Sequence, residues 1–258
     1  MDVITLTTAN IASLAHERPS VLALGFFDGV HRGHQRVLAT AKHQAANAGL
    51  PLAVMTFDRH ASQVFPGPHS ADFRYLTTLD QKAALMADLG VERLYVVRFT
   101  PAFASLSPAA FVSAYLVGLH ARRVVAGFDY TFGRGGVAGV QTLARLAAGR
   151  FATTVVTELQ QGQDKVSSTR IRRLIATGQL VAAEALLGHP YVVSLQAQGA
   201  ALVPQSAQQL PPAGAYLATT GAGAEVVVEV NGKRVLGLTA PGGVQLRFKQ
   251  AQALTAIG

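Results

Sequence analysis

The first residues with an evident chemical use are those of Gly25–His34, which reads Gly-Phe-Phe-Asp-Gly-Val-His-Arg-Gly-His. A predicted strand ends there and a predicted helix begins, so His31 and His34 share one side with the free N–H groups of the new helix. A helix start favours phosphate, and imidazole donors stabilise charge on a transferring phosphoryl group. Gly33 lets the backbone approach the ligand. This string predicts a phosphate site; the structural alternative is a helix start that carries two histidines.

A second polar string, Val166–Arg172, also stands at a predicted helix start. It contains three consecutive hydroxyl groups, those of Ser167, Ser168 and Thr169, together with two arginines. Ser168 is the expected helix cap, and hydroxyl and guanidinium donors together suit a polyphosphate. A purely structural cap is the alternative, although capping needs one hydroxyl and no arginine.

Asp129 follows another predicted strand, within the segment Gly127–Gly133. It is a candidate for contact with a nucleotide or a metal, and a turn aspartate between two aromatic core residues is the alternative. The adjoining Gly133–Ala138 fits the phosphate-binding pattern G-x-G-x-x-A only loosely, because its glycines come several residues after the strand. We interpret that stretch as a loop.

The strand predicted at Leu52–Phe57 is followed by Asp58, Arg59 and His60. Phe57 at its end could stack on a flat ring, and Asp58 or His60 could form hydrogen bonds to that ring. A structural role for these residues is equally open.

The elements that must position these residues alternate between strand-like and helix-like segments up to residue 188. This alternation predicts an α/β domain with a mostly parallel sheet covered on both faces, which binds ligands outside the carboxyl ends of its strands. The loops after Phe26, Phe57 and Gly127 are therefore the candidates for a site. The predicted strands are Val21–Phe26, Leu52–Phe57, Leu94–Phe99, Arg123–Gly127 and Ala152–Thr157, and the predicted helices are His34–Ala48, Thr78–Leu89, Ser107–Leu119, Gln141–Ala148, Ser168–Thr177 and Val181–Leu187.

The pattern changes after Gly188-His189-Pro190 to short β-like runs without helices between them. Asn231-Gly232 between two of these runs is a strong hairpin signal. We expect two domains, residues 1–189 and residues 190–258, of which the second is a small antiparallel β module. Its predicted strands are Tyr191–Gly199, Ala215–Thr219, Glu225–Val230, Lys233–Leu238 and Val244–Phe248.

Composition excludes several classes of protein. Of the 258 residues, 50% are hydrophobic and 14% are charged, which argues against intrinsic disorder. No apolar run is long enough to cross a membrane, and the absence of cysteine excludes disulfides, thiol nucleophiles and zinc–thiolate sites. The N-terminus does not resemble a signal peptide, so we expect a cytoplasmic protein. Phosphate-loop, zinc-protease, serine-hydrolase and protein-kinase signatures are missing.

The net charge of +8 is compatible with RNA, an anionic membrane or small phosphorylated ligands as partners. A solvated basic surface is an equal alternative, because no block of five to eight basic residues occurs. The aromatic pattern of an RNA-binding module is also missing. We expect small-molecule substrates, and neither a membrane nor a nucleic acid partner.

Taken together, these strings resemble bacterial bifunctional riboflavin kinase/FAD synthetases in their order and spacing. The resemblance covers about residues 5–191, the FMN adenylyltransferase module of that family. It is carried by Gly25–His34 (G-x-F-D-G-V-H-x-G-H), Thr56–His60 (T-F-D-x-H), Gly127–Gly133 (G-x-D-Y-x-F-G), Ser167–Arg172 (S-S-T-R-I-R) and the module junction Leu186–Tyr191.

The resemblance implies a Rossmann-like nucleotidyltransferase that transfers AMP from ATP to FMN, giving FAD and pyrophosphate, with Mg²⁺ carried on the nucleotide. It assigns catalytic roles to His31, His34 and Asp129, and no residue to a resident metal. It places ATP contacts on Gly25, Phe26, Phe27, Asp28, Gly33, Gly127, Ser167, Ser168, Thr169 and Arg172, and FMN contacts on Phe57, Asp58, His60, Tyr130 and Phe132.

The chain departs from the family pattern on the FMN side. Arg59 and Ala61 stand where the family usually has prolines, and the loop after Gly133 lacks a basic residue followed by Gly-Asp. Two other functions therefore stay open. One is nucleotidyl transfer to another phosphorylated small molecule; the other is a non-catalytic flavin or nucleotide sensor, against which the His31/His34 pair argues.

The second module departs further. The Gly-Phe-Pro-Thr-Ala-Asn string of the family's kinase module is missing, although Leu210–Tyr216 is similar to a later kinase segment. We expect a shortened, degenerate kinase barrel without riboflavin kinase activity, which serves as a structural remnant or as the contact of a homo-oligomer.

Overall fold

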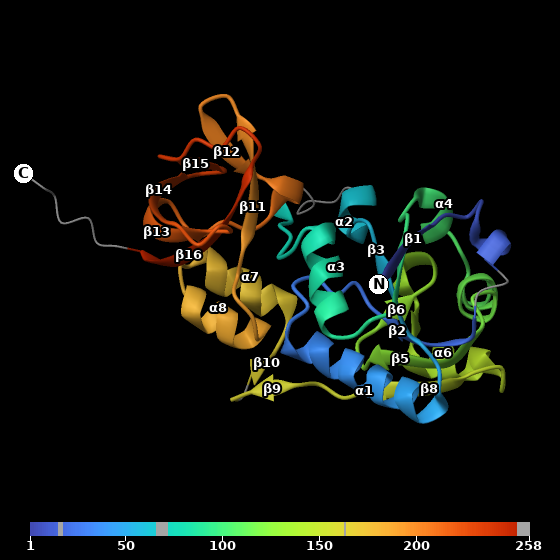
Figure 1. The fold of residues 1–258 in the computed structure, drawn as a ribbon. Helices are drawn as coiled ribbons and strands as arrows, with labels where there is room; N and C mark the ends of the chain where they lie inside the picture. Colours follow the sequence, from blue (N-terminus) through green and yellow to red (C-terminus); the bar gives the residue numbers. More distant parts are fainter. Residues whose placement is uncertain (15–17, 66–71, 163, 252–258) are drawn as a thin grey trace, which may run out of the picture. The chain divides into compact units, whose positions relative to one another are not determined.

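The computed structural model describes residues 1–14, 18–65, 72–162 and 164–251, and the chain divides into two compact units (Figure 1). Two short segments from the N-terminal half belong to the second unit together with the C-terminal part. The first unit comprises Met1–Phe27, Gly33–Asp72 and Ala83–Leu159, and the second comprises Asp28–Arg32, Phe73–Lys82 and Gln160–Gly258.

The first unit is built on a six-stranded sheet in which neighbouring strands are parallel, as the sequence predicted. Their order across the sheet is β1-β4-β3-β2-β5-β8. β1, which the sequence analysis did not identify, forms one edge. The strands are β1 (Asp2–Leu6), β2 (Ser20–Leu24), β3 (Leu52–Phe57), β4 (Arg93–Val97), β5 (Ala121–Gly127) and β8 (Ala152–Val156).

Hydrophobic side chains explain why the central strands lie inside. Leu22 and Leu24 of β2 join the main hydrophobic core, and every other residue of β2 is buried as well. Burial on both faces is typical of a parallel sheet that helices cover on both sides. On helix α1 (Arg32–Ala48) the buried positions are Val37, Leu38, Ala41 and Ala45, which is the helical spacing of a single apolar face.

The remaining helices of this part of the chain are short. Among the described residues, no helix is both long enough and apolar enough to cross a membrane. They are α2 (Ala61–Val64), α3 (Leu79–Asp88), α4 (Pro101–Ala104), α5 (Pro108–Phe111), the π-helical turn η3 (Val112–Val117) and α6 (Val140–Ala147), with 3₁₀ turns at η1 (Ile11–Leu14) and η4 (Arg134–Gly136).

Local signals set two of the helix starts. Thr78 Oγ1 accepts a hydrogen bond from Gln81 N at 3.2 Å, and Gln81 Oε1 accepts one from Thr78 N at 3.0 Å, a reciprocal cap before α3. Ser107 Oγ accepts from Ala110 N at 3.2 Å before α5. The helix predicted from Ser107 to Leu119 is not regular, because it widens into the π turn after α5.

The strand order places a topological switch at β2. The chain continues from β2 to β3 on one side of it, while β5 lies on the other side. Ligands of open parallel sheets bind where such a switch opens a crevice at the carboxyl ends of the strands. The loops that begin at Gly25 and Phe128 leave β2 and β5 at this position.

The stretch Gly133–Ala138, expected to be a loop, belongs to a small hairpin. Strands β6 (Thr131–Phe132) and β7 (Ala138–Gly139) pair antiparallel, and η4 forms the turn between them. Gly133, Gly135 and Gly136 have φ of 75°, 68° and 67°. These left-handed conformations explain why glycine is concentrated in this turn.

The second unit contains a closed antiparallel barrel with the order β11-β12-β15-β14-β13-β16, which confirms the predicted β module. The predicted hairpin joins β14 to β15, but its turn residues are Gly232 and Lys233 rather than Asn231 and Gly232. Asn231 ends β14 and pairs with Arg234, and Gly232 has φ of 59°. The strands are β11 (Val193–Gln198), β12 (Ala201–Pro204), β13 (Gly214–Thr220), β14 (Glu225–Asn231), β15 (Arg234–Leu236) and β16 (Val244–Ala251), with a 3₁₀ turn, η5 (Gln205–Ala207).

Helices α7 (Ser168–Ala176) and α8 (Leu180–Leu187), with the small hairpin of β9 (Gln160–Gln161) and β10 (Asp164–Lys165), also fall in the second unit. The predicted boundary at residue 189 instead grouped both helices with the sheet. Glu184 on α8 forms an ion pair with Arg247 on β16 at 2.7 Å and accepts from Tyr191 N at 2.8 Å. These contacts join the helices to the barrel.

Candidate active site

A polar pocket of about 450 Å³ opens in the first unit at the carboxyl ends of β2, β3, β4 and β5. Each of these strands contributes residues from its end or from the loop that follows. The location matches the crevice expected at the topological switch. The lining residues include Gly25, Phe26, Phe27, His34, Phe57, His60, Phe99, Gly127, Asp129 and Tyr130.

The wall that follows β2 is tightly constrained. Thr56 Oγ1 donates a hydrogen bond to Phe26 O at 2.8 Å, which joins this loop to β3. A Cβ atom on Gly25 would lie 2.8 Å from the ring of Phe27, so only glycine fits there without movement of that ring. The Phe27 ring also meets His34 edge-on at 5.2 Å between centroids, which restricts the position of the imidazole.

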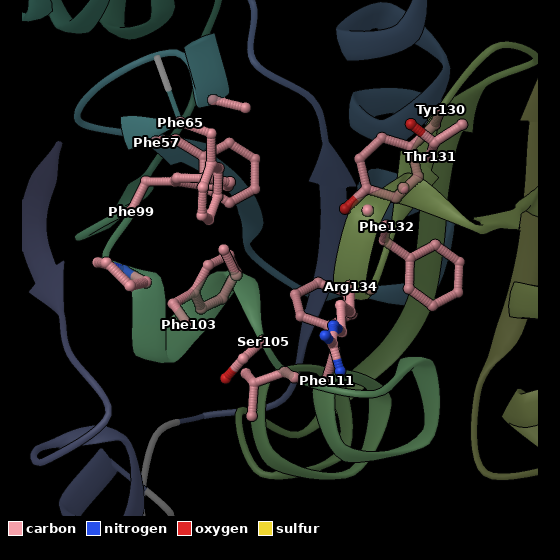
Figure 2. A pocket seen from close by; sticks show the side chains of 17 residues that line it. Phe57, Phe65, Phe99, Phe103, Ser105, Phe111, Tyr130, Thr131, Phe132 and Arg134 are labelled. Atoms are coloured by element: carbon pink, nitrogen blue, oxygen red, sulfur yellow. The ribbon is translucent and has the colours of Figure 1, made fainter. Parts of the chain in front are cut away.

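A second, aromatic pocket of about 700 Å³ adjoins the polar one. Figure 2 shows Phe57 and Phe99 on one side of this pocket and Tyr130 and Phe132 on the other, with Arg134 near one end. Its walls can accept a large flat ring. The two pockets adjoin, because both are lined by Phe57, Ala61, Phe99, Tyr130 and Thr131.

The aromatic walls support one another. The rings of Phe57 and Phe99 meet edge-on at 5.5 Å, and Phe99 meets Phe103 at 5.4 Å. Tyr130 stacks on Phe132 at 6.0 Å with 17° between the ring planes. Burial raises the pKa of Tyr130, so its phenol stays protonated at neutral pH.

The five residues predicted to contact FMN are placed in different ways. Phe57, Tyr130 and Phe132 line the aromatic pocket, and His60 lines the polar one. Asp58 lines neither of these two pockets. Its Oδ1 accepts a hydrogen bond from Phe99 N at 2.9 Å, which restrains the backbone of a residue in the aromatic wall. His60 also caps α2, since its Nδ1 accepts from Ser62 N at 3.3 Å.

Other residues of the aromatic pocket were missed from the sequence. Phe99 follows β4 at the carboxyl end of the sheet. Ligands of parallel sheets bind at this end, so the loop after β4 is a candidate in the same way as the loops after β2, β3 and β5. Phe103, Phe111 and Arg134 line the pocket from α4, α5 and η4, whose positions depend on tertiary contacts rather than on local sequence. No sequence signal marks them.

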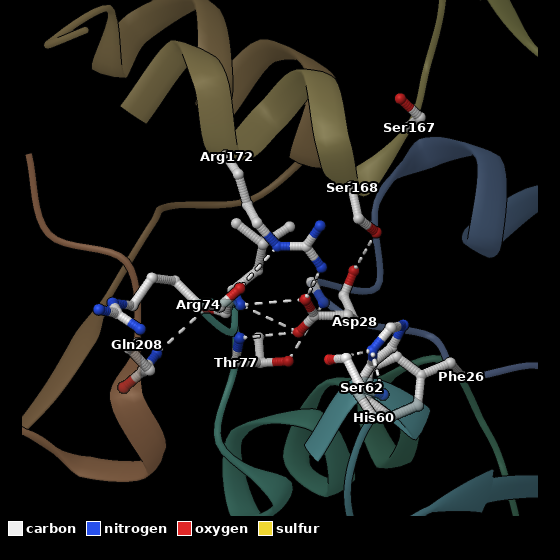
Figure 3. A network of polar contacts seen from close by, with 12 residues as sticks. Phe26, Asp28, His60, Ser62, Arg74, Thr77, Ser167, Ser168, Arg172 and Gln208 are labelled. Carbon is white, nitrogen blue, oxygen red and sulfur yellow. Dashed lines mark hydrogen bonds and ion pairs between the residues drawn. The ribbon is translucent and has the colours of Figure 1, made fainter. Parts of the chain in front are cut away.

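Asp28 is the centre of a polar network within the second unit, drawn in Figure 3. Its carboxylate is 2% exposed and accepts from Leu76 N at 3.0 Å and from Thr77 N at 3.3 Å. Arg172 forms an ion pair with the same carboxylate at 2.6 Å. The Asp28 carbonyl accepts from Ser168 Oγ at 2.9 Å. Two residues predicted to contact ATP, Asp28 and Arg172, are therefore bound to each other.

The start of α7 differs in one detail from the sequence prediction. Ser167 rather than Ser168 is the cap, because Ser167 Oγ accepts from Arg170 N at 3.3 Å. Ser168 is the first helical residue, and its hydroxyl is used in the contact to Asp28. Thr169 is exposed, and its side chain faces solvent as a candidate ligand donor.

His31 directly precedes α1 and is 5% exposed. The backbone before it is strained, because Val30 has φ of 38°, a left-handed value that β-branched residues rarely adopt. Strain of this kind concentrates at functional sites, where surrounding contacts maintain it. His34 follows in the first turn of the same helix.

The described residues contain no group of three His, Cys, Asp or Glu side chains arranged to hold a metal ion. Asp129 is the carboxylate that lines the polar pocket.

A family model described as FAD synthetase matches residues 13–170, more than half of the chain. The chain belongs to the FAD synthetase family. A bifunctional riboflavin kinase/FMN adenylyltransferase of Listeria monocytogenes is 45% identical over 247 residues, with 91% of this chain and 76% of the relative covered. A FAD synthetase of the same organism is 30% identical, with 88% and 90% covered.

Two further comparisons concern length and fold. The chain covers only 61% of the bifunctional relative from Bacillus subtilis, with 41% identity over 193 residues. The crystal structure of a Streptococcus pneumoniae protein described as a macrolide-efflux protein has a TM-score of 0.83 and 26% identity, covering 98% of this chain and 100% of that one. The fold of this chain thus recurs in a solved structure.

Family membership confirms the resemblance found in the sequence. The reaction of the FAD synthetase family is transfer of AMP from ATP to FMN, and its substrates are ATP and FMN. The individual site residues rest on the geometry above and remain predictions.

Lys82 is a buried cation of the second unit that the sequence did not single out. It is 4% exposed. Burial lowers the pKa of Lys82 to about 8 from 10.5, and the nearby negative charge of Asp28 counteracts part of this effect. Removal of a cation from water is costly even beside a carboxylate.

The pH dependence of stability follows from this pKa. Between pH 8 and 10.5 the unfolded chain binds more protons at Lys82 than the folded chain, so the free energy of unfolding rises with pH in this window. Relative to Lys82→Met, the wild type should gain about 2 kcal/mol between pH 7.5 and 9.5. Urea unfolding at both pH values measures the gain, and the exposed-site variant Lys233→Met is the control. Parallel pH dependences of the wild type and Lys82→Met would contradict the prediction.

Proposed function

We propose that this chain binds the isoalloxazine ring of FMN in its aromatic pocket and joins the FMN phosphate to AMP at the polar pocket. The single observation that supports this proposal most is that an aromatic and a polar pocket adjoin at the carboxyl ends of the sheet strands and share five lining residues. A substrate with one flat apolar end and one anionic end fits this pair of environments.

The flavin half of the proposal rests on the character of the walls. Phe57 and Phe99 on one side and Tyr130 on the other offer faces and edges to a planar ring. These three residues also line the polar pocket, so a molecule bound between them reaches both environments. The protonated Tyr130 phenol adds no charge that would repel a phosphate.

The chemical step is an in-line displacement. A phosphate oxygen of FMN forms a bond to the α-phosphorus of ATP, the bond from that phosphorus to its bridging oxygen breaks, and pyrophosphate leaves. The step needs positioning and stabilisation of charge on phosphoryl oxygens more than covalent help. In our proposal His31 and His34 supply that stabilisation, because they stand at the start of α1, where helix N–H groups also favour anions.

The other phosphate contacts are proposed for the second string. Thr169 and the N-terminal N–H groups of α7 suit phosphate oxygens, with Arg172 as the cationic donor. Asp129 at the polar pocket is proposed to act near the reacting groups. Mg²⁺ bound to the ATP phosphates would neutralise part of their charge.

We further propose that the chain lacks riboflavin kinase activity. The barrel is complete, but the sequence has no Gly-Phe-Pro-Thr-Ala-Asn string, and β11 connects to β12 through the short turn Gly199-Ala200. With ATP, Mg²⁺ and riboflavin we expect no FMN above the rate of a protein-free control. Formation of FMN at the rate of FAD synthesis would overturn this part of the proposal.

The first experiment tests the reaction itself. Purified protein with ATP, Mg²⁺ and FMN should form FAD, detected by chromatography, and His34→Ala should lower kcat by about 100-fold or more with a smaller change in the KM for ATP. His43→Ala is the matched control, because His43 is exposed on the same helix. A loss of ATP binding without a change in turnover would contradict the role of His34.

If no FAD forms while ATP is consumed with another phosphorylated acceptor, the nucleotidyl transfer stands and the acceptor changes. If ATP binds but no acceptor reacts, the protein is a nucleotide sensor. A panel of phosphorylated small molecules, assayed for pyrophosphate release, separates these outcomes.

The aromatic pocket has its own test. Phe99→Ala should raise the KM for FMN by about 10-fold, because it removes a ring that faces the flavin, while the KM for ATP stays within about two-fold. Phe128→Ala is the control, since this phenylalanine follows the same sheet edge but is 41% exposed and lines neither pocket. Equal effects of both variants on FMN would contradict the assignment of the pocket.

A further inference from the structure

Asp28 lies in the middle of a turn whose backbone is strained. Phe27 and Val30 have φ of 54° and 38°, and Gly29 between them has φ of 79°. Left-handed conformations cost free energy for residues other than glycine and persist only where the surroundings enforce them. His31 immediately follows this turn. The groups that enforce the turn therefore decide where His31 is held.

We propose that Asp28 is a positioning residue for adenylyl transfer, which holds the turn that carries His31 and the guanidinium of Arg172 in one fixed geometry. The proposal rests on the proposed function. It differs from the contact with ATP that the sequence suggested for Asp28.

The chemistry of the carboxylate supports a positioning role over contact with substrate. Asp28 is 2% exposed, and its oxygens already accept from two backbone N–H groups and from Arg172. A carboxylate repels the phosphates of ATP, so direct contact would be unfavourable. Bound to Arg172, the same carboxylate orients a cation without facing the phosphates itself.

Arg172 is constrained from three directions. Its Nη2 donates to Asp28 Oδ2 at 2.6 Å, and its Nε donates to Arg74 O at 2.6 Å. The guanidinium also lies over the ring of Phe73, at 4.6 Å from its centroid. A guanidinium carries five N–H donors in a rigid plane. Within the described part of the chain, Nη1 makes no hydrogen bond and is left for an anionic ligand.

Three more backbone atoms of the same turn make contacts (Figure 3). Ser168 Oγ at the start of α7 donates to Asp28 O at 2.9 Å, and Gly29 N donates to Thr77 Oγ1 at 3.2 Å. His189 Nε2 lies 3.0 Å from Gly29 O and provides a further contact. The turn before His31, the start of α7 and Arg172 are therefore held as one assembly, and the side chain of Asp28 is at its centre.

Replacement of Asp28 by asparagine tests the proposal, because it keeps the shape and removes the charge that binds Arg172. We expect Asp28→Asn to raise the KM for ATP by about 10-fold and to lower kcat by about 10- to 100-fold. The KM for FMN should stay within about two-fold of the wild type. Activities are measured well below the melting temperature of each variant.

Glu184→Gln is the matched control. Glu184 binds Arg247 through two hydrogen bonds at 2.9 and 2.7 Å and accepts from Tyr191 N, so it is also a carboxylate paired with arginine in the second unit. This variant should lower the melting temperature and leave both kinetic constants within about two-fold. If Asp28→Asn behaves in the same way, Asp28 is merely structural and the proposal is overturned.

A double-mutant cycle tests whether Asp28 acts through Arg172. In an Arg172→Gln background, Asp28→Asn should change the KM for ATP by less than about two-fold, because the group that it positions is already gone. Independent, multiplicative effects of the two substitutions on this KM would overturn the proposal.

Two additions keep the test decisive. If Asp28→Asn does not fold, Thr77→Val removes the tie to Gly29 N from a residue outside the binding groups, and kcat should fall by about 3- to 10-fold. An unchanged kcat would overturn the proposal.

If the wild type forms no FAD, calorimetric titration with ATP still compares Asp28→Asn with Glu184→Gln. Weaker ATP binding in Asp28→Asn alone supports positioning of Arg172, and equal binding overturns it, whatever becomes of the proposed function.

Discussion

A single buried carboxylate, that of Asp28, constrains the turn between β2 and α1 and orients Arg172. The turn between β2 and α1 contains two non-glycine residues with positive φ, and each such residue costs about 1–3 kcal/mol. Asp28 offsets this cost by accepting from Leu76 N, Thr77 N and Arg172. Hydrogen bonds to a charged group are stronger than neutral ones, so a carboxylate suits this task better than an amide.

The charge of Asp28 also explains the surrounding cations. A buried carboxylate needs compensation, and Arg172 and Lys82 provide it within the same unit. A polyphosphate binds near cations, whereas an unbalanced carboxylate would repel it. In our proposal the negative charge makes the turn rigid and orients Arg172, whose Nη1 makes no hydrogen bond within the described residues.

Local sequence patterns were enough to predict those elements whose formation depends mainly on their own residues. Runs of apolar residues, with glycine and proline signals at their ends, predict most strands of the sheet and the helices that follow them. The His31/His34 pair stands out because it lies at one of the predicted strand–helix junctions. β1 and β12 were missed because Asp2–Leu6 is exposed over most of its length and Ala201–Pro204 is short and ends in proline. Such strands exist because a neighbouring strand pairs with them, which the sequence pattern does not record.

The same distinction separates the two halves of the site. The residues that we propose to bind phosphate stand out in the sequence because histidines and hydroxyls lie at helix starts, where helix N–H groups favour anions. Their role stays a prediction. The aromatic pocket was only partly predictable. Phe103 and Phe111 are core residues, 7% and 2% exposed, and their place in the pocket wall comes from the tertiary packing of α4, α5 and the β6–β7 hairpin. The engagement of Asp28 with Arg172, 144 residues away in the chain, had no local signal at all.

The barrel has a physical use that does not depend on kinase chemistry. Gln208, 1% exposed, donates from Nε2 to Leu76 O at 3.1 Å, and Tyr75 N donates to Ala207 O at 3.1 Å. Leu76 is the residue whose N–H binds Asp28. Ala207 of η5 and the following Gln208 therefore position the backbone of Tyr75 and Leu76, and Leu76 N in turn donates to the Asp28 carboxylate. The barrel thus helps to keep the turn before His31 in its strained conformation, whether or not it carries out chemistry of its own.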